Sequence, residues 1–163
     1  MGSLPPVNKR IPIEVVRVID GDTLKIKRNQ KLERVRLLYI DAPELNSANL
    51  LEHSKALEAR KYIVSLIHRG RSVTIEQGAF KRDHYGRILA HVYVDDMHLQ
   101  PLLLKRGLAR CVIPNRARKL KSERKYLKEF RRLEIMAQKA GRGIWEYEQN
   151  NGTILSQVKS IQS

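Results

Sequence analysis

The sequence predicts an α+β fold made mainly of β-strands: a five-stranded Greek-key barrel with three helices. Two observations favour it. Three consecutive β-branched segments precede one segment with helical spacing, and two further alternating segments follow that helix. With 163 residues, 42% of them hydrophobic, the chain is long enough for one domain with its own core and too short to expect two.

The first three strands are expected to form a meander. Residues 13–19 (IEVVRVI) are β-branched, and Asp20-Gly21 supplies a tight-turn signal that needs no function of its own. Residues 23–27 alternate apolar and charged side chains, and Asn29-Gln30 predicts a second turn. Residues 32–40 (LERVRLLYI) then form the third strand, which ends where the sequence turns to Asp-Ala-Pro.

The period then changes to that of an amphipathic helix, which Gly70 ends. Its apolar positions recur at steps of three and four residues: Ala56, Ala59, Ile63, Leu66 and Ile67. Residues 72–77 and 87–94 alternate again, which predicts strands four and five. This order of strands and helix is that of the oligonucleotide/oligosaccharide-binding (OB) fold.

Two more helices are predicted after the fifth strand. Residues 99–107 form a short one, with Pro101 in its first turn and Gly107 at its end. The last helix should run over 118–140 and end at Gly141. One of its faces is apolar and should meet the core: Tyr126, Phe130, Leu133 and Ala137.

The ends of the chain look different from its middle. Residues 1–11 are polar with prolines, and residues 149–163 are rich in Asn, Gln and Ser, so both are expected to be flexible segments around a domain at 12–148. The start MGSLPPVNKR lacks the apolar segment of a signal peptide, but it equally fits an expression-vector remnant joined to a trimmed domain, which leaves the localisation open. No apolar run approaches the roughly 18 residues of a membrane span.

The charge of the chain favours a polyanionic partner. Lys and Arg number 32 against 17 Asp and Glu, which gives +15, and nucleic acid is a better match than an anionic membrane. Fourteen Lys or Arg and three Glu lie between Lys105 and Arg142, so +11 of the charge is in that third. Only Glu123 interrupts six cations, a density that favours phosphate attraction over a merely solvated helix: Arg116, Arg118, Lys119, Lys121, Arg124 and Lys125.

Cysteine and histidine offer no chemistry of their own. Cys111 is the only cysteine and lies in an apolar run, so we expect a small buried side chain instead of a catalytic thiol. The five His are scattered, and no zinc site is indicated.

Acidic residues instead follow two of the predicted strands. Asp22 comes just after the first turn, and Asp41 and Glu44 follow the third strand in the stretch DAPE. Taken singly, each suits a turn or a solvated strand end. Asp22 and Asp41 with a backbone carbonyl are also the oxygen ligands that a hard cation such as calcium prefers. The helix-loop-helix calcium motif is excluded, since Lys25 and Lys31 stand where it needs Gly and Glu.

The motifs together resemble the thermonuclease family, the staphylococcal-nuclease-like domains. IDGDT, VRLLYIDAPE, DHYGR, LLKRGLAR and the late GIW occur in the order and spacing of that family, from about Val16 to Trp145. The family fold is a five-stranded barrel with three helices.

The resemblance implies a role for several single residues. Asp22 and Asp41 would be carboxylate ligands of Ca²⁺, and Ala42 would add its backbone carbonyl. Glu44 would be the general base that activates water, and Arg36 and Arg87 would grip the scissile phosphate. Three residues would lie in a loop near the nucleotide: Asp83, His84 and Tyr85. For Tyr85, a turn residue packed on the barrel is an equally good interpretation.

The sequence departs from the family in two places. The best-known member has tyrosines near Ile113 and Asn115 that line the base pocket, and this chain has none, so base preference stays open. Residues 45–56 (LNSANLLEHSKA) replace a lysine-rich loop before the first helix and contain Glu52 and His53. Because of this second departure, the preference between single-stranded and double-stranded substrates also stays open.

The implied activity is a calcium-dependent, sugar-non-specific endonuclease of DNA and RNA that leaves 3'-phosphates and favours single-stranded or unpaired regions. The alternative is a catalytically silent module that binds nucleic acid or protein. Such a module should have lost at least one catalytic position, and this chain has them all. A membrane-surface protein would need large apolar residues beside the basic face, and those between Arg116 and Lys139 are expected to dock on the core. A monomer is expected.

Overall fold

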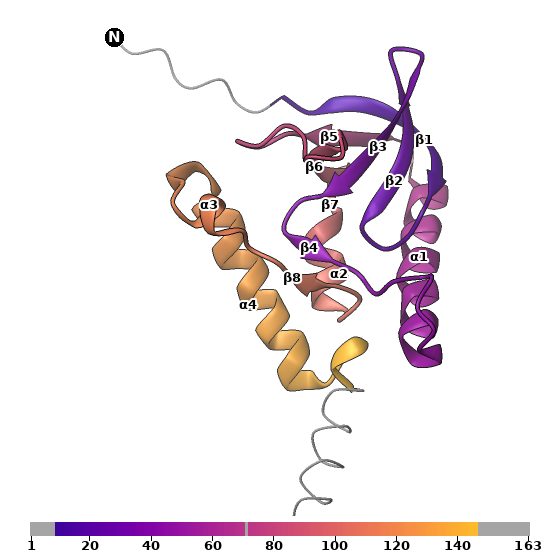
Figure 1. Cartoon of the computed structure of the whole chain (residues 1–163), viewed down its shortest axis with the longest axis vertical. Helices are drawn as coiled ribbons and strands as arrows, with labels where there is room; N and C mark the ends of the chain where they lie inside the picture. Colours follow the sequence, from indigo (N-terminus) through magenta and orange to yellow (C-terminus); the bar gives the residue numbers. More distant parts are fainter. Residues whose placement is uncertain (1–8, 71, 147–163) are drawn as a thin grey trace, which may run out of the picture.

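The computed structural model describes residues 9–70 and 72–146 and shows a closed five-stranded barrel (Figure 1). Antiparallel pairing joins the strands in the order β3-β2-β1-β5-β6, and a parallel pairing of β3 with β6 closes the barrel. The barrel strands are β1 (Ile11–Val18), β2 (Thr23–Arg28), β3 (Lys31–Leu37), β5 (Val73–Glu76) and β6 (Ile88–Val94). The predicted α+β barrel is confirmed.

Three short strands complete the sheets. β7 (Met97–His98) extends β6, whereas β4 (Ile40–Asp41) pairs with β8 (Arg110–Cys111) outside the barrel. Three helices of seven or more residues occur in the described part: α1 (Leu50–Arg69), α2 (Leu99–Lys105) and α4 (Arg124–Ala140). In Figure 1, α1 lies on the right and α4 on the left, with β4 and β8 between them.

The predicted core faces are confirmed. Phe130, Leu133 and Ala137 of α4 are buried, and Tyr126 packs against the core partly buried. Cys111 is buried as expected, and burial raises the pKa of its thiol to about 11, which keeps it protonated at neutral pH.

The predicted turn at Asn29-Gln30 is also found, with φ of 49° and 64°. Two successive left-handed residues are what a tight two-residue hairpin needs. The third strand, by contrast, is not continuous over 32–40. Tyr39 has φ of 63° and separates β3 from β4, so the chain turns just before Asp41.

The first helix was predicted to start too late. α1 begins at Leu50 and not near Ala56, because the side chain of Asn49 accepts hydrogen bonds from the amides of Leu51 and Glu52 and so caps the helix. Residues 50–56, more than half of the segment 45–56 that was expected to be a loop, are therefore helical.

The last helix starts later than the predicted residue 118. A short α3 (Asn115–Arg118) and a 3₁₀ turn η1 (Lys121–Glu123) precede α4. The side chain of Glu123, 1% exposed, accepts hydrogen bonds from the Tyr39 hydroxyl (2.6 Å) and the Ala79 amide (3.3 Å). These contacts with distant parts of the chain fix a bend that helix propensity does not predict.

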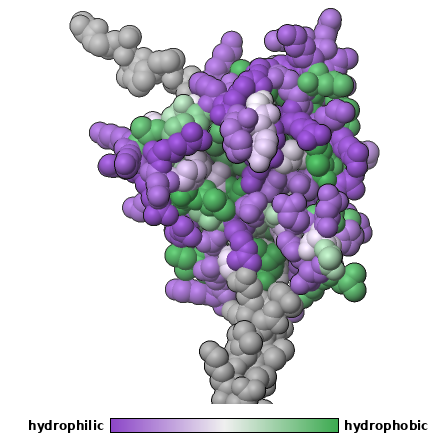
Figure 2. Space-filling view, viewed as in Figure 1, coloured by the Kyte–Doolittle hydropathy of each residue, from purple (hydrophilic) through white to green (hydrophobic). Residues whose placement is uncertain are grey.

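The segments predicted to be flexible fall mostly outside the described residues, which exclude 1–8 and 147–163. Ile11, placed by prediction in the N-terminal segment, lies in β1 and pairs with Ile75. Within 9–70 and 72–146 no helix is both long and apolar enough to cross a bilayer. The face in Figure 2 is mostly hydrophilic, with hydrophobic residues in separate groups.

Candidate active site

Asp22 lies where the end of β4 meets the start of β2. The residue is 6% exposed, and its carboxylate accepts hydrogen bonds from the Thr23 hydroxyl and the Ala42 amide, both at 2.8 Å. Gly21 lets the backbone before Asp22 pack closely against Ala42 and Ala59, since a Cβ at position 21 would lie 2.6 Å from the Cβ of Ala42 and 2.8 Å from that of Ala59. The interpretation of Gly21 as only a turn residue was incomplete.

Arg36 joins two of the predicted carboxylates. One terminal nitrogen lies 3.1 Å from an oxygen of Asp41 and 3.5 Å from an oxygen of Asp22. The other donates to the carbonyls of Leu37 (3.0 Å) and Ile40 (2.7 Å), across the turn between β3 and β4. Arg36 therefore holds the turn that presents Asp41, and its guanidinium stands beside both acids.

The pKa values of Asp41 and Asp20 are raised in the neighbourhood of Asp22. Burial and then the charge of Asp22 raise the pKa of Asp41, although the charge of Arg36 lowers it. Burial and then Asp22 raise the pKa of Asp20 to about 6. A neighbouring carboxylate disfavours the ionised form of Asp41 and of Asp20, and a cation bound between such acids would favour that form again.

The donor set suits a hard cation. Asp22 and Asp41 offer carboxylate oxygens, and Ala42 is buried beside them with its amide bound to Asp22. Within the residues that the structure describes, no group of three or more His, Cys, Asp or Glu side chains is placed to hold a metal. Further ligands for a cation would have to be backbone carbonyls and water, which calcium accepts.

Glu44 is exposed, and the loop that carries it is fixed by the start of α1. Glu52 accepts from the Glu44 amide (3.4 Å) and from the Ser47 hydroxyl (2.5 Å), and these hydrogen bonds lower its pKa. The ring of His53 is 2.6 Å from the Leu45 carbonyl oxygen. The positioning role of Glu52 was missed, although an Asn followed three residues later by Glu is a signal for a helix start.

Arg87 is oriented by Asp83. The Arg87 side chain donates to Asp83 at 2.7 Å, and Asp83 also accepts from the amides of Arg87 (2.9 Å) and Tyr85 (3.0 Å). Burial alone would raise the pKa of Asp83, but these hydrogen bonds and the charge of Arg87 outweigh it and lower the pKa. Asp83 thus shapes the loop and aligns the arginine.

His84 and Tyr85 stand away from the barrel. Tyr85 is 73% exposed, so the interpretation of a residue packed on the barrel was wrong. The ring centroids of His84 and Tyr85 lie 3.9 Å apart, and the Arg87 guanidinium is 5.4 Å from the Tyr85 ring. Exposed rings beside an arginine are available to stack on a base.

Two hollows flank β4. One, of about 340 Å³, contains Asp41 and Glu44 with two cations that sequence reasoning missed, Lys55 and Arg110. The other, of about 190 Å³, contains Arg36 and Asp83; its further lining includes Phe80, Val112, Pro114 and Arg116. Arg36, Asp41, Ala42, Glu44 and Asp83 thus line the two hollows beside one short strand, whereas Arg87, His84 and Tyr85 line neither.

The lining of the second hollow differs from the tyrosine-lined base pocket that the resemblance implies. The guanidinium of Arg116 lies 4.1 Å from the centroid of the Phe80 ring, and both line the hollow. An isolated Phe in a polar connection and an Arg in a charge run carry no sequence signal for this pairing.

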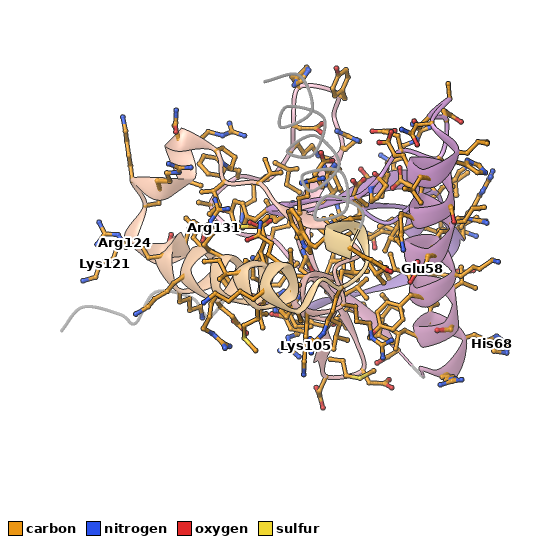
Figure 3. All side chains as sticks on the ribbon, turned by 90° about the horizontal axis from the view of Figure 1, so that it is seen from below. Glu58, His68, Lys105, Lys121, Arg124 and Arg131 are labelled. Atoms are coloured by element: carbon orange, nitrogen blue, oxygen red, sulfur yellow. The ribbon has the colours of Figure 1, made fainter. Side chains whose placement is uncertain are left out.

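The basic segment predicted to attract phosphate, residues 116–125, lies on the surface of the protein. All six of its cations are exposed, and Glu123, the acid among them, is buried. Figure 3 shows Lys121 and Arg124 pointing outward at one end of α4, with Arg131 further along. Ile135 (40%) and Met136 (43%) are also exposed, so the expectation that all apolar residues of this helix dock on the core was wrong.

Comparison with known proteins decides the family. A sequence model described as "Staphylococcal nuclease homologue" matches residues 34–147. The chain belongs to the staphylococcal nuclease family. The matched range includes Arg36, Asp41, Glu44 and Arg87, and the resemblance drawn from the sequence motifs is confirmed.

Relatives within the staphylococcal nuclease family carry nuclease names. The chain is 35% identical over 147 residues to Endonuclease YncB of Bacillus subtilis (strain 168), covering 88% of this chain and 67% of that protein. It is 34% identical over 135 residues to SPbeta prophage-derived endonuclease YokF of the same organism, covering 83% and 44%. Identity to the thermonuclease of Staphylococcus hyicus is 30% over 132 residues, covering 81% and 74%. The chain thus spans two thirds of the first relative's length and less than half of the second's.

Proposed function

We propose that this protein is a calcium-dependent, sugar-non-specific endonuclease that hydrolyses phosphodiester bonds of DNA and RNA. One observation carries the proposal: a single nitrogen of Arg36 stands between Asp22 and Asp41. Glu44 follows three residues after Asp41, in a hollow of about 340 Å³ that both line. The endonuclease and thermonuclease names of the relatives support the reaction class.

Ca²⁺ is the proposed cofactor, held by the carboxylates of Asp22 and Asp41 and the carbonyl of Ala42. When bound, the ion supplies positive charge to the phosphoryl oxygens, on which negative charge builds during hydrolysis. The hydrogen bonds to Asp22 hold its carboxylate in one orientation before anything binds.

Glu44 is the proposed general base. The residue is exposed and lines both the hollow that contains Asp41 and a separate third hollow that contains Asp20, so water and a phosphodiester can both reach it. As water attacks phosphorus, Glu44 accepts the proton of the water, the bond from phosphorus to the 5'-oxygen breaks, and that oxygen takes a proton from solvent and leaves as a 5'-hydroxyl, so the phosphate stays on the 3' side. A base in this role contributes typically about 10²–10⁴-fold to the rate.

Arg36 and Arg87 are proposed to stabilise the charged transition state. A guanidinium offers two parallel donors to two phosphate oxygens, which a lysine does not. Both arginines are fixed by carboxylates and carbonyls of the protein, Arg87 through Asp83 and Arg36 through Asp41. Donors held in place before the reaction lose little freedom when charge develops.

The nucleotide beside the cleaved bond is proposed to lie near Asp83, His84 and Tyr85. The exposed rings offer stacking faces that accept any base. Stacking needs unpaired bases, so single-stranded regions are the preferred substrates, and nothing in this set of groups reads a 2'-hydroxyl. The protein is proposed to act as a monomer.

The competing function is a binding module without catalysis. Asp22, Arg36, Asp41, Glu44 and Arg87 are all present; ion pairs join Arg36 to Asp22 and Asp41, and Arg87 pairs with Asp83. A module freed from catalysis has no need to keep this set.

Glu44→Gln tests the proposal against the binding module. The variant should cleave single-stranded DNA about 10²–10⁴-fold more slowly and bind it with unchanged affinity, since only the base is lost. Glu129→Gln, an exposed acid on α4, is the charge-matched control. Equal cleavage by all three proteins would remove Glu44 from the mechanism.

A further inference from the structure

A row of three cations crosses the outer face of β1, β2 and β3. Arg17 pairs with Lys25, and Lys25 pairs with Arg34. Directly opposed residues of antiparallel strands point to the same face, so the three side chains are neighbours. Arg17 and Arg34 are exposed, and Lys25 is partly exposed. Like charges in directly opposed positions destabilise a sheet, so the row is not explained by the stability of the barrel.

An irregularity in β1 produces this row. Val15 pairs with Ile26 and the next pair is Arg17 with Lys25, so Val16 is an extra residue in β1. In a regular ladder Val16 would stand opposite Lys25. Val16 is 49% exposed, so the bulge does not serve to bury it. Bulges of this kind often occur next to active sites, where they redirect a side chain.

The neighbouring lysine on the same face has a different environment. Lys27, two residues beyond Lys25 on β2, is opposite Glu14 on β1 and Leu32 on β3. None of the three cations of the row forms an ion pair with an acidic side chain of the residues described. Lys27 therefore has an acid in one opposed position, whereas Lys25 has a cation in both.

The row adjoins the proposed catalytic residues. Arg34 lies two residues before Arg36 on the same strand face, about 7 Å along β3. Val35 pairs with Ile88, and the residues just before them are Arg34 and Arg87. The row also lines a third hollow, separate from the two that flank β4 and likewise of about 340 Å³, which contains the acids Asp20 and Glu44. A strand whose scissile phosphate meets Arg36 and Glu44 therefore has this row beside it.

We propose that Arg17, Lys25 and Arg34 bind the backbone phosphates next to the phosphodiester being cleaved. The assignment rests on the proposed nuclease function and deepens it. Three adjacent strands span about 10 Å, and a stacked nucleic-acid strand carries one phosphate per roughly 3.4 Å, so the row matches two or three phosphates. Contacts to phosphates add affinity without reading bases, which suits a non-specific enzyme.

The test compares two double variants of one hairpin. Lys25→Ala/Arg34→Ala removes two cations of the row, and Lys27→Ala/Lys31→Ala removes two exposed cations outside it. Each is assayed on a long oligothymidylate and on a thymidine nitrophenyl phosphodiester, which has no flanking phosphate. Binding of the oligothymidylate is measured by anisotropy at several salt concentrations in a Glu44→Gln background, which keeps the strand intact.

The row variant should lose about 10-fold in kcat/KM on the oligomer relative to the control and stay within about twofold on the nitrophenyl ester. The slope of its plot of log affinity against log salt concentration should be shallower than the parent's by about 1.4, because each lost contact to a phosphate of a single strand removes about 0.7 and two contacts are lost. Equal losses in the two double variants, or equal losses on both substrates, would overturn the proposal. The Gln/Gln variant at the same two positions repeats the test with larger side chains if the Ala variant unfolds.

The binding arm separates this proposal from the nuclease function. If the parent protein binds the oligomer and cleaves neither substrate, the nuclease proposal fails, and the anisotropy difference between the double variants still decides whether the row contacts the strand. If the parent cleaves both substrates and the row variant binds like the control, the row proposal alone fails.

Discussion

Acid should destabilise this protein through a pair of histidines, of which His91 is buried and His98 is partly buried. The ring of His91 is 0% exposed and its Nδ1 lies 3.0 Å from Nε2 of His98, while its own Nε2 has no hydrogen-bond partner among the described residues. His91 stacks on Tyr126 of α4 with centroids 4.1 Å apart. The pair therefore lies at the contact between β6 and α4.

Both histidines are held neutral. Burial, the charge of His98 and the charge of Lys125 lower the pKa of His91 to about 3. Burial, Arg10 and Lys125 lower the pKa of His98 to about 4. The charges that face the pair from α4 and from the start of β1 are thus positive and add to the effect of burial.

The size of the loss follows from these values. An unfolded histidine has a pKa near 6.5, so below that pH the unfolded chain takes up protons that the folded chain does not, and the free energy of unfolding falls. Between pH 7 and pH 5 each histidine should cost about 2 kcal/mol, and the pair about 4 kcal/mol. The loss continues until the pH reaches the folded pKa values of about 3 and 4.

Urea unfolding at pH 7 and pH 5 measures this loss, and His98→Gln isolates it. Glutamine can keep the hydrogen bond to His91 and does not titrate, so the variant should lose about 2 kcal/mol less than the parent over this pH step. The comparison cancels the contribution of the carboxylates, which both proteins share. Equal losses in the two proteins would show that His98 is not held neutral by the fold.

Four further outcomes are expected. Asp22→Ala should weaken calcium binding, followed by isothermal titration, and an unchanged titration would speak against the site. Glu52→Ala should lower kcat with little change in KM, because the loop that carries Glu44 is no longer held. Glu52→Gln should restore much of the lost kcat. In a Glu44→Gln background neither substitution at Glu52 should change kcat. Gly21→Ala should cost about 1–3 kcal/mol in chemical unfolding, because the new Cβ has no room; full stability would show that the backbone shifts freely. Binding of single-stranded DNA should weaken steeply with salt, and a flat response would make the basic helix an ordinary surface.

Sequence reasoning succeeded where local pattern decides the structure. Alternation and β-branching predicted the barrel strands, and helical spacing predicted which side of α4 meets the core. The two turn residues Asn29 and Gln30 were predicted because few side chains tolerate that backbone. The motifs pointed to the family because several residues had to appear in register.

The errors have a common physical cause, which is contact with residues distant in the sequence. Glu123 bends the chain before α4 because it bonds Tyr39 and Ala79, some 84 and 44 positions away. Position 21 has no room for a side chain because Ala42 and Ala59 lie too close to it. The row of Arg17, Lys25 and Arg34 depends on the register of three strands and on a one-residue bulge in β1. No local sequence pattern predicts either of them.

The central claim is most directly tested by cleavage of a fluorescent single-stranded DNA with calcium, and then with excess chelator. The account predicts cleavage that needs calcium and stops when the chelator is added. Tight binding with no cleavage in calcium, magnesium or manganese would contradict it and show a binding module that has kept the site of a nuclease.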